Sequence, residues 1–395
     1  MDRAVIRSWS LLLRSRRARF AAPAVIGALG ALGALGALGA LGALGALGAL
    51  AVLALAAPAA AGQVPATAKP KVIATIKLSL MPSAVAIGPR TGTVYVTSYL
   101  DRVTSASGAI TVINGTTRKL ATTITDDHQP VAAAVSPLTG DVYIANSGVG
   151  YNNFSESGGI WVINGKTNKV TATIAGVTSA GAVTVSPKTG DVYALASEPK
   201  ASGVLVISPK TNKIVTAIPD PNDAAAIAVS PLTGNVYVLN SSFSSTSVWV
   251  VNGKTNKVTA KIAAAAGATA VAVSPLTGSI YVTTATYVLP DGNPRLGGIQ
   301  VINAKTDKIT ATIADGNSPW GIAFSPRTGD PYIANQGWGE NATSYPGNVS
   351  LLNPKTNKAI GSIIDWDSPT DVAVSPQTND AYVANLNETV WVVSP

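Results

Sequence analysis

The chain contains no cysteine and only one histidine, and these scarcities exclude several kinds of chemistry. Without cysteine there are no disulfides, no thiolate metal ligands and no cysteine nucleophile. The sequence also lacks a nucleophile elbow, a phosphate-binding loop and an HExxH zinc motif. Charged residues make up only 12% of the chain and apolar residues 47%, which favours a large core over disorder. We therefore expect no cofactor, no metal site and no catalytic residue.

The net charge of +8 overstates the basic character of most of the chain. Six arginines and Asp2 lie among the first 20 residues and supply five of these charges, which leaves +3 for the remainder. That remainder is too small to favour nucleic acid as a partner, and we do not expect nucleic-acid binding.

Residues 1–61 have the pattern of an export signal. Arginines precede an uncharged apolar tract that contains eight Gly-Ala-Leu triplets and ends at Ala59-Ala60-Ala61. This pattern predicts a secreted, cell-surface or periplasmic protein. As one helix the tract would be about 60 Å long, twice the thickness of a bilayer's hydrocarbon core. It is either cleaved or partly retained as an anchor, which would be the only membrane contact. Residues 62–70 are interpreted as a linker.

A phrase that recurs seven times organises residues 71–395. Its clearest copy is Ser-Pro-Leu-Thr-Gly-Asp-Val-Tyr-Ile at 136–144, and the copies are spaced by 44 to 51 residues. Each unit predicts four strands, which we name a to d in chain order, with tight a–b and c–d turns and a variable b–c loop. A repeat of this period is typical of a β-propeller with one unit per blade.

The two chain ends predict how the ring closes. The last unit stops after strand c at Pro395, and residues 71–78 match strand d of the other units. Pairing these segments would remove an exposed sheet edge. We therefore predict an all-β fold, a seven-bladed β-propeller with four-stranded blades, in which strand 71–78 completes the last blade. An open solenoid is the alternative.

The turns predict backbone conformations. Glycine ends the a–b turn in six units and Asn379 replaces it in the seventh, which indicates a positive φ. Glycine, alanine and proline interchange at the start of the c–d turn, which indicates a negative φ there. Three residues later, Asn168 and its equivalents favour a positive φ, and Arg118 is the exception to the residue type.

Two motifs carry a family resemblance. The b strands end in sequences such as Tyr-Val-Ala-Asn at 382–385, and Val-Ile-Asn-Gly-Lys-Thr-Asn-Lys-Val spans 162–170. In these motifs the chain resembles the YVTN-repeat β-propeller family from Lys71 to its end. The resemblance implies an exported or surface-layer-like seven-bladed propeller.

We expect the ligand site on the face that carries the d–a and b–c loops, near the centre of the ring. Seven aspartates in the d–a loops make that face acidic, whereas lysines occupy the c–d turns of the opposite face. Variable loops on a rigid scaffold are where binding usually occurs. The predicted ligand-binding residues are Trp320, Trp338, Trp366, Asp126, Asp127, His128, Asp365 and Asp367.

Alternatives stay open for each of these groups. A tryptophan here either contacts a ligand or packs between blades, and His128 beside two carboxylates is either an ordinary loop residue, a base or half a metal site. The lysines are either a solvated surface or a ring that meets an anionic polymer. The function we favour is a monomeric binding or scaffold propeller whose partner is a cell-wall polymer, glycan or protein. A structural surface-layer protein is the second reading, and a propeller lactonase or lyase is the third.

Overall fold

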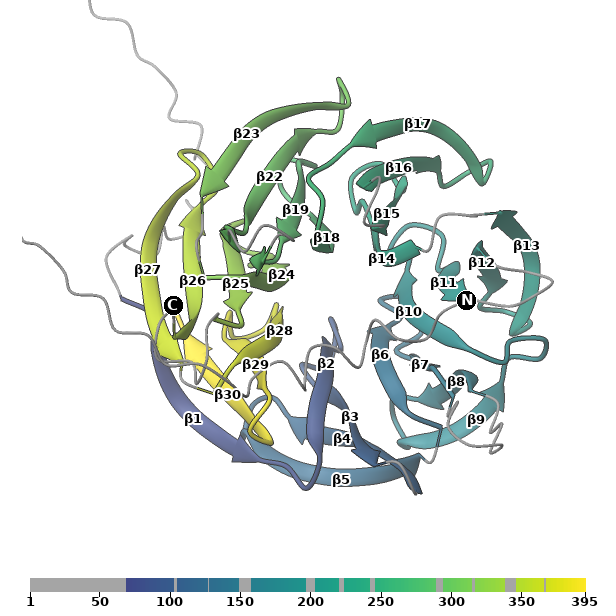
Figure 1. The fold of residues 1–395 in the computed structure, drawn as a ribbon. Helices are drawn as coiled ribbons and strands as arrows, with labels where there is room; N and C mark the ends of the chain where they lie inside the picture. Colours follow the sequence, from purple (N-terminus) through teal and green to yellow (C-terminus); the bar gives the residue numbers. More distant parts are fainter. Residues whose placement is uncertain are drawn as a thin grey trace, which may run out of the picture. The chain divides into compact units, whose positions relative to one another are not determined.

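The computed structural model describes residues 69–102, 105–126, 128–148, 158–196, 203–219, 224–241, 246–288, 294–314, 317–337, 346–365 and 367–395. Within these ranges every helix or strand element is a β-strand, and no helix there has the length and apolar character to cross a bilayer. The strands form seven four-stranded antiparallel sheets, which Figure 1 shows arranged around a common centre. The predicted seven-bladed β-propeller is confirmed.

The blades are numbered in chain order, with strand a innermost. Blade 1 holds β2 (Met81–Ile87), β3 (Val94–Arg102), β4 (Ser105–Asn114) and β5 (Lys119–Asp126). Blade 2 holds β6 (Pro130–Val135), β7 (Val142–Asn146), β8 (Gly159–Asn164) and β9 (Lys169–Thr173). Blade 3 holds β10 (Ala180–Val185), β11 (Val192–Ala196), β12 (Gly203–Ser208) and β13 (Lys213–Pro219). Blade 4 holds β14 (Ala224–Val229), β15 (Val236–Ser241), β16 (Thr246–Asn252) and β17 (Lys257–Ala263).

The remaining blades include the closing one. Blade 5 holds β18 (Ala268–Val273), β19 (Ile280–Thr284), β22 (Gly298–Asn303) and β23 (Lys308–Ala314), with a small hairpin of β20 (Tyr287–Val288) and β21 (Pro294–Arg295) in its b–c loop. Blade 6 holds β24 (Pro319–Phe324), β25 (Pro331–Asn335), β26 (Gly347–Asn353) and β27 (Lys358–Asp365). Blade 7 holds β28 (Pro369–Val374), β29 (Ala381–Asn385), β30 (Thr389–Ser394) and β1 (Lys71–Lys77).

The ring closes as the chain ends predict. β1 pairs antiparallel with β30, with Lys71 opposite Ser394 and Lys77 opposite Thr389. The inner strands contact one another in the order β2, β6, β10, β14, β18, β24, β28 and back to β2. β1 thus covers the edge of β30 and takes the outermost place in blade 7, which strand d holds in the other blades.

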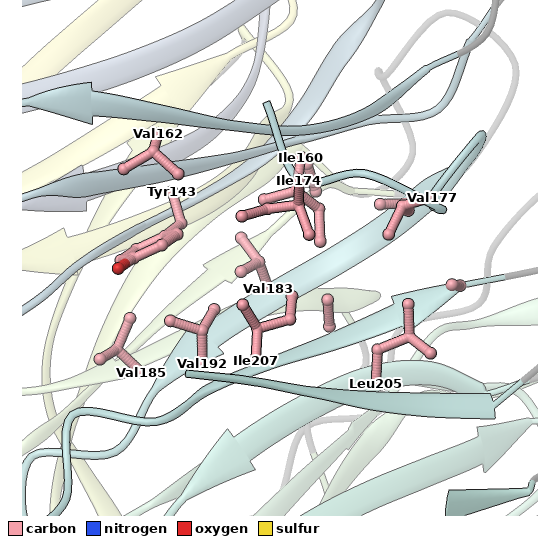
Figure 2. Packing of buried hydrophobic residues seen from close by; sticks show 14 residues of the cluster. Tyr143, Ile160, Val162, Ile174, Val177, Val183, Val185, Val192, Leu205 and Ile207 are labelled. Carbon is pink, nitrogen blue, oxygen red and sulfur yellow. The ribbon is translucent and has the colours of Figure 1, made fainter. Parts of the chain in front are cut away.

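The core lies between neighbouring blades. Figure 2 shows Tyr143 and Val162 of blade 2 facing Val183 and Val192 of blade 3, and these four side chains are between 0% and 7% exposed. The b strands carry a tyrosine in every copy, and each of these tyrosines is at most 2% exposed. The repeated phrase is therefore scaffold, since its aromatic residue fills the interface between blades.

The tyrosine of the phrase also ties its blade to the next one. The Tyr95 hydroxyl lies 3.3 Å from the Gly165 carbonyl and 3.3 Å from Asn168 Oδ1, both in the c–d turn of blade 2. A Cβ at Gly165 would lie 2.0 Å from the Gly140 carbonyl, so the c–d turn approaches the a–b turn of its own blade too closely for a side chain. The predicted positive φ is found at Gly140 (83°) and at Asn168 (55°).

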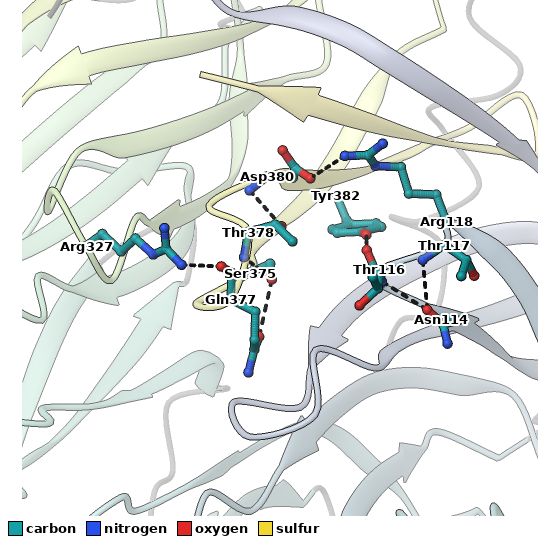
Figure 3. Close-up of polar contacts among 11 residues, drawn as sticks. Asn114, Thr116, Thr117, Arg118, Arg327, Ser375, Gln377, Thr378, Asp380 and Tyr382 are labelled. Atoms are coloured by element: carbon teal, nitrogen blue, oxygen red, sulfur yellow. Dashed lines mark hydrogen bonds and ion pairs between the residues drawn. The ribbon is translucent and has the colours of Figure 1, made fainter. Parts of the chain in front are cut away.

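Two departures from the repeat, Arg118 in blade 1 and Asn379 in blade 7, make contacts on the two sides of blade 7. Arg118 adopts the same positive φ (57°) as its asparagine equivalents, and its guanidinium donates to Asp380 of blade 7 at 3.0 Å (Figure 3). Tyr382 donates to the Gly115 carbonyl at 2.9 Å. On the other side, Ser325 of blade 6 donates to Asn379 Oδ1 at 2.6 Å. The side chains of Arg118 and Asn379 thus add contacts that join blade 7, which holds both chain ends, to blades 1 and 6.

Candidate functional site

A cleft of about 280 Å³ lies on the d–a and b–c face, across blades 6, 7 and 1. These blades are neighbours because the ring closes between blades 7 and 1. The lining comes from the first residues of the inner strands and from residues at or just beyond the ends of the b strands. It consists of Met81, Pro82, Ser83, Tyr99, Trp320, Gln336, Thr370 and Leu386.

A shift in strand register places one part of this lining. In every blade the pairing between strands a and b skips one residue near the start of strand a, which is the signature of a β-bulge. In blades 1, 6 and 7 the skipped residues are Ser83, Trp320 and Thr370, and all three line the cleft. The other four blades carry Val131, Gly181, Ala225 and Thr269 there. Trp320 is 41% exposed and is the only aromatic residue at this position.

The backbone beneath Trp320 is held by blade 5. Thr269 donates to the Pro319 carbonyl at 2.9 Å, and Thr283 Oγ1 lies 3.3 Å from the Trp320 carbonyl. Ser83 of blade 1 makes the matching contact with the Pro130 carbonyl of blade 2 at 3.0 Å. The indole is therefore carried by an anchored strand, which gives a binding surface less conformational freedom to lose.

The fourth residue after the tyrosine of each b strand supplies the second part of the lining. In blades 1, 6 and 7 these residues are Tyr99, Gln336 and Leu386, and all three line the cleft. The equivalent positions of blades 2 to 5 hold Ser147, Ser197, Ser241 and Ala285. Large side chains at this position are thus confined to the three blades that form the cleft.

Beneath the cleft, blades 6 and 7 differ from the others at the next inner position. Blades 1 to 5 carry alanine there, whereas blade 6 has Gly321 and blade 7 has Asp371. A Cβ at Gly321 would lie 2.8 Å from Asp371 Cα and 3.1 Å from its Oδ1, so the glycine makes room for the aspartate. Asp371 Oδ2 accepts the Val85 N–H of blade 1 at 2.9 Å.

Burial raises the pKa of Asp371 to about 6, and the backbone N–H groups of Val85 and Val372 oppose this rise. The residue as a whole keeps partial exposure to solvent, although its carboxyl is largely enclosed. A carboxyl with this pKa is mostly ionised at neutral pH and mostly protonated below pH 5. It is the one acidic group at its position in the seven inner strands.

Asp126 and His128 form a separate pair where blade 1 leads into blade 2. Asp126 is 1% exposed, and its Oδ1 accepts the His128 backbone N–H at 2.9 Å and lies 3.1 Å from Nδ1. Burial raises the pKa of Asp126, and His128 and Asn146 partly offset this. The imidazole lies edge-on to Trp161 with ring centroids 5.3 Å apart. The carboxylate fixes the orientation of the ring, but neither residue lines the cleft.

The predicted site residues therefore do not form one site. Trp320 lines the cleft, and the Asp126–His128 pair lies apart from its lining. Asp367 takes part through its backbone, because its carbonyl accepts the Leu386 N–H at 3.1 Å. Asp365 ends β27, opposite Gly347. Trp338, Trp366, Asp127 and the side chain of Asp365 lie outside the described residues.

Apart from Trp320, none of the eight lining residues was predicted, nor was Asp371. Their signal was nevertheless present in the sequence. When the seven units are aligned on the Ser-Pro phrase, Trp320, Gln336 and Asp371 each stand at a position where most other units have a small residue. Within the described residues, no three His, Cys, Asp or Glu side chains come together as a metal site would require.

The comparisons with known proteins bear on the fold. No family model matches the chain, and no curated protein matches it. Among solved structures, the chain is similar to hydrazine synthase of Kuenenia stuttgartiensis, with a TM-score of 0.65 and 18% sequence identity. The likeness covers 84% of this chain and 98% of that chain. At this identity the likeness supports a propeller architecture and carries no activity across.

Proposed function

We propose that this protein is an exported, cell-surface binding propeller of the YVTN-repeat type, and that its cleft holds a neutral sugar unit of a glycan. The YVTN-like motifs and the apolar N-terminal tract support the first part. The second part is supported by one observation: the exposed Trp320 lies beside Tyr99, Gln336 and Leu386, and these three occupy a position of the repeat that carries a large side chain only in the blades that form the cleft.

The chemistry of the lining favours a neutral, partly apolar ligand. Among the described residues no charged side chain lines the cleft. The exposed Trp320 indole offers a flat apolar surface, and pyranose rings present apolar C–H faces of matching shape. The Gln336 amide can pair with sugar hydroxyls, and the hydroxyls of Ser83 and Thr370, which donate to the Pro130 and Ala384 carbonyls, can accept hydrogen bonds from them. A volume of about 280 Å³ suits a small ligand or one end of a chain.

The decisive test is binding of neutral hexoses and N-acetylhexosamines by Trp320→Ala, measured by saturation-transfer NMR and calorimetry on the full chain. Burying an aromatic surface against a ligand contributes about 2 kcal/mol, so we expect roughly 30-fold weaker binding. Val131→Ala is the matched control, because it truncates the equivalent bulge residue of blade 2 outside the cleft.

A second variant restores the repeat. Gln336→Ser combined with Leu386→Ser installs the residue that blades 2, 3 and 4 carry at this position. We expect it to remove binding while leaving the unfolding midpoint within a few degrees of that of the wild type. Unchanged sugar binding in both cleft variants would refute the cleft as the site. Failure of the wild type to bind any of these sugars would refute the ligand class.

A further inference from the structure

Every outermost strand of the propeller begins with an exposed lysine. In the pairing register each of these lysines lies opposite the last or next-to-last residue of a c strand, as Lys169 does opposite Asn164 and Lys71 opposite Ser394. All seven therefore stand at the same end of their blades, the end that carries the a–b and c–d turns. We call this set the basic rim: Lys71, Lys119, Lys169, Lys213, Lys257, Lys308 and Lys358.

A second set of lysines lies beside the basic rim. Five of the six c–d turns carry an exposed lysine three residues before the rim lysine: Lys166, Lys210, Lys254, Lys305 and Lys355. Asp307 is the only acidic residue in these turns. Within the described part of the chain the ion pairs are Arg118–Asp380 and Asp126–His128, and neither involves a rim or turn lysine. The a–b turns of this face add Asp141, Asp191, Asp330 and Asp380 as well as Arg90, Lys188 and Arg327, so basic residues still clearly outnumber acidic ones on the face.

Exposed leucines lie inside this ring of charge. The a–b turns of blades 2, 4 and 5 present Leu138, Leu232 and Leu276, which are 43%, 45% and 53% exposed. Each leucine lies over the a–b turn of the next blade; for example, a Cβ at Gly190 would lie 3.1 Å from Leu138 Cδ1. The leucines therefore lie along the surface of this face and do not enter the core. Lysine together with exposed leucine on one face is the composition of surfaces that rest on membranes.

The chain also enters the propeller on this face. β1 begins at Lys71, beside the C-terminal end of β30, and residue 61 ends the apolar tract only ten positions earlier. The cleft lies on the opposite face, with the d–a and b–c loops.

We propose that the basic rim docks flat on a lipid bilayer that carries anionic headgroups. A ring of lysines at one level can meet a planar surface all at once, whereas a linear polyanion can follow only an arc of it. Each lysine near an anionic bilayer strengthens partition about fivefold, and the leucines add apolar contact. This contact goes beyond an anchor made by the N-terminal tract alone. It leaves the opposite face, with its cleft, open to solution, and it does not depend on what the cleft binds.

The test compares two triple variants of the full chain in flotation with vesicles of phosphatidylcholine alone or mixed with phosphatidylglycerol. One variant neutralises three rim lysines: Lys169→Gln, Lys257→Gln and Lys358→Gln. The matched control removes the same charge away from the rim: Lys77→Gln, Lys261→Gln and Arg295→Gln. If all three rim lysines contact lipid, partition onto anionic vesicles should fall roughly 100-fold in the rim variant. In the control it should change by less than about threefold, because charges beyond the Debye length are screened.

Orientation gives a second readout, because the chain has no cysteine and one introduced cysteine can be labelled alone. Thr211→Cys places a fluorophore on an exposed c–d turn, and Ala175→Cys places it on an exposed residue of the opposite face. With quencher-bearing anionic vesicles, the label at 211 should be quenched and the label at 175 should not.

Three results would overturn the proposal. The first is equal quenching at both positions, and the second is equal loss of vesicle binding in the two triple variants. The third is rim-dependent binding of soluble polyphosphate with no preference for anionic over neutral vesicles, which would identify a linear polyanion as the partner.

Discussion

Asp371 makes the stability of this propeller depend on pH in a direction that can be worked out. Asp371→Ala installs the alanine that blades 1 to 5 carry at the same position of the inner strand. The change removes the carboxyl together with its hydrogen bond from the Val85 N–H. Gly321 already leaves space at this point, so the variant creates no clash with blade 6.

The magnitude follows from the raised pKa. Burial raises the pKa of Asp371 from 3.8 to about 6, so the folded protein binds this proton more tightly than the unfolded chain. The stabilisation is present below pH 4 and is lost as the pH rises through 6. Two pKa units correspond to at most about 3 kcal/mol, and the partial exposure of the residue reduces that figure. Losing the hydrogen bond costs the variant about 1 kcal/mol at every pH.

We therefore expect the free-energy difference between wild type and Asp371→Ala to change sign with pH. The wild type should be the more stable protein at pH 4, and the variant should equal or exceed it at pH 7.5. Urea unfolding of both proteins across this range measures the difference, in which the contributions of other titrating groups cancel. Asp371→Asn is the control, since it retains an oxygen that can accept the Val85 N–H but cannot titrate.

The two variants should differ from each other by a constant offset at all pH values. If the difference in unfolding free energy between wild type and Asp371→Ala varies by less than about 0.5 kcal/mol from pH 4 to 7.5, that result refutes the argument. It would mean that solvent reaches the carboxyl in the folded protein as freely as in the unfolded chain.

Two further predictions concern the contacts between blades. Tyr382→Phe removes a 2.9 Å hydrogen bond to the Gly115 carbonyl and should lower the unfolding free energy by about 1 kcal/mol. Tyr143→Phe should leave the unfolding free energy unchanged, because the Tyr143 hydroxyl is buried without a partner among the described residues. Equal losses in the two variants would contradict this. Arg118→Asn leaves Asp380 unpaired at a side-chain exposure of 6%, and should cost about 1 to 2 kcal/mol. A double-mutant cycle with Asp380→Asn measures the coupling, and additive losses would show that the pair contributes none.

Much of the scaffold could be predicted because comparing the copies of the repeat shows which backbone conformation each turn position requires. Interchange of glycine and asparagine at 379 predicted a positive φ, and the structure has φ 65° there. The match between 71–78 and other d strands predicted the closing strand, which spans Lys71–Lys77. The role of Arg118 could not be predicted in this way. Its partner Asp380 is 262 residues away, and only the closed ring brings the two together.

Seven copies of one unit, read along the chain, determine the blade, its turns and the way in which the two ends must pair, because these depend on local backbone preferences and on alternating burial. The candidate site has a different origin. Ser83, Trp320 and Thr370 belong to three units spread over 287 residues, and they line one cleft only because the first unit packs against the last. In the sequence each of these side chains is only a difference between one unit and the others. Closure of the ring brings these differing residues together, and that depends on the tertiary structure.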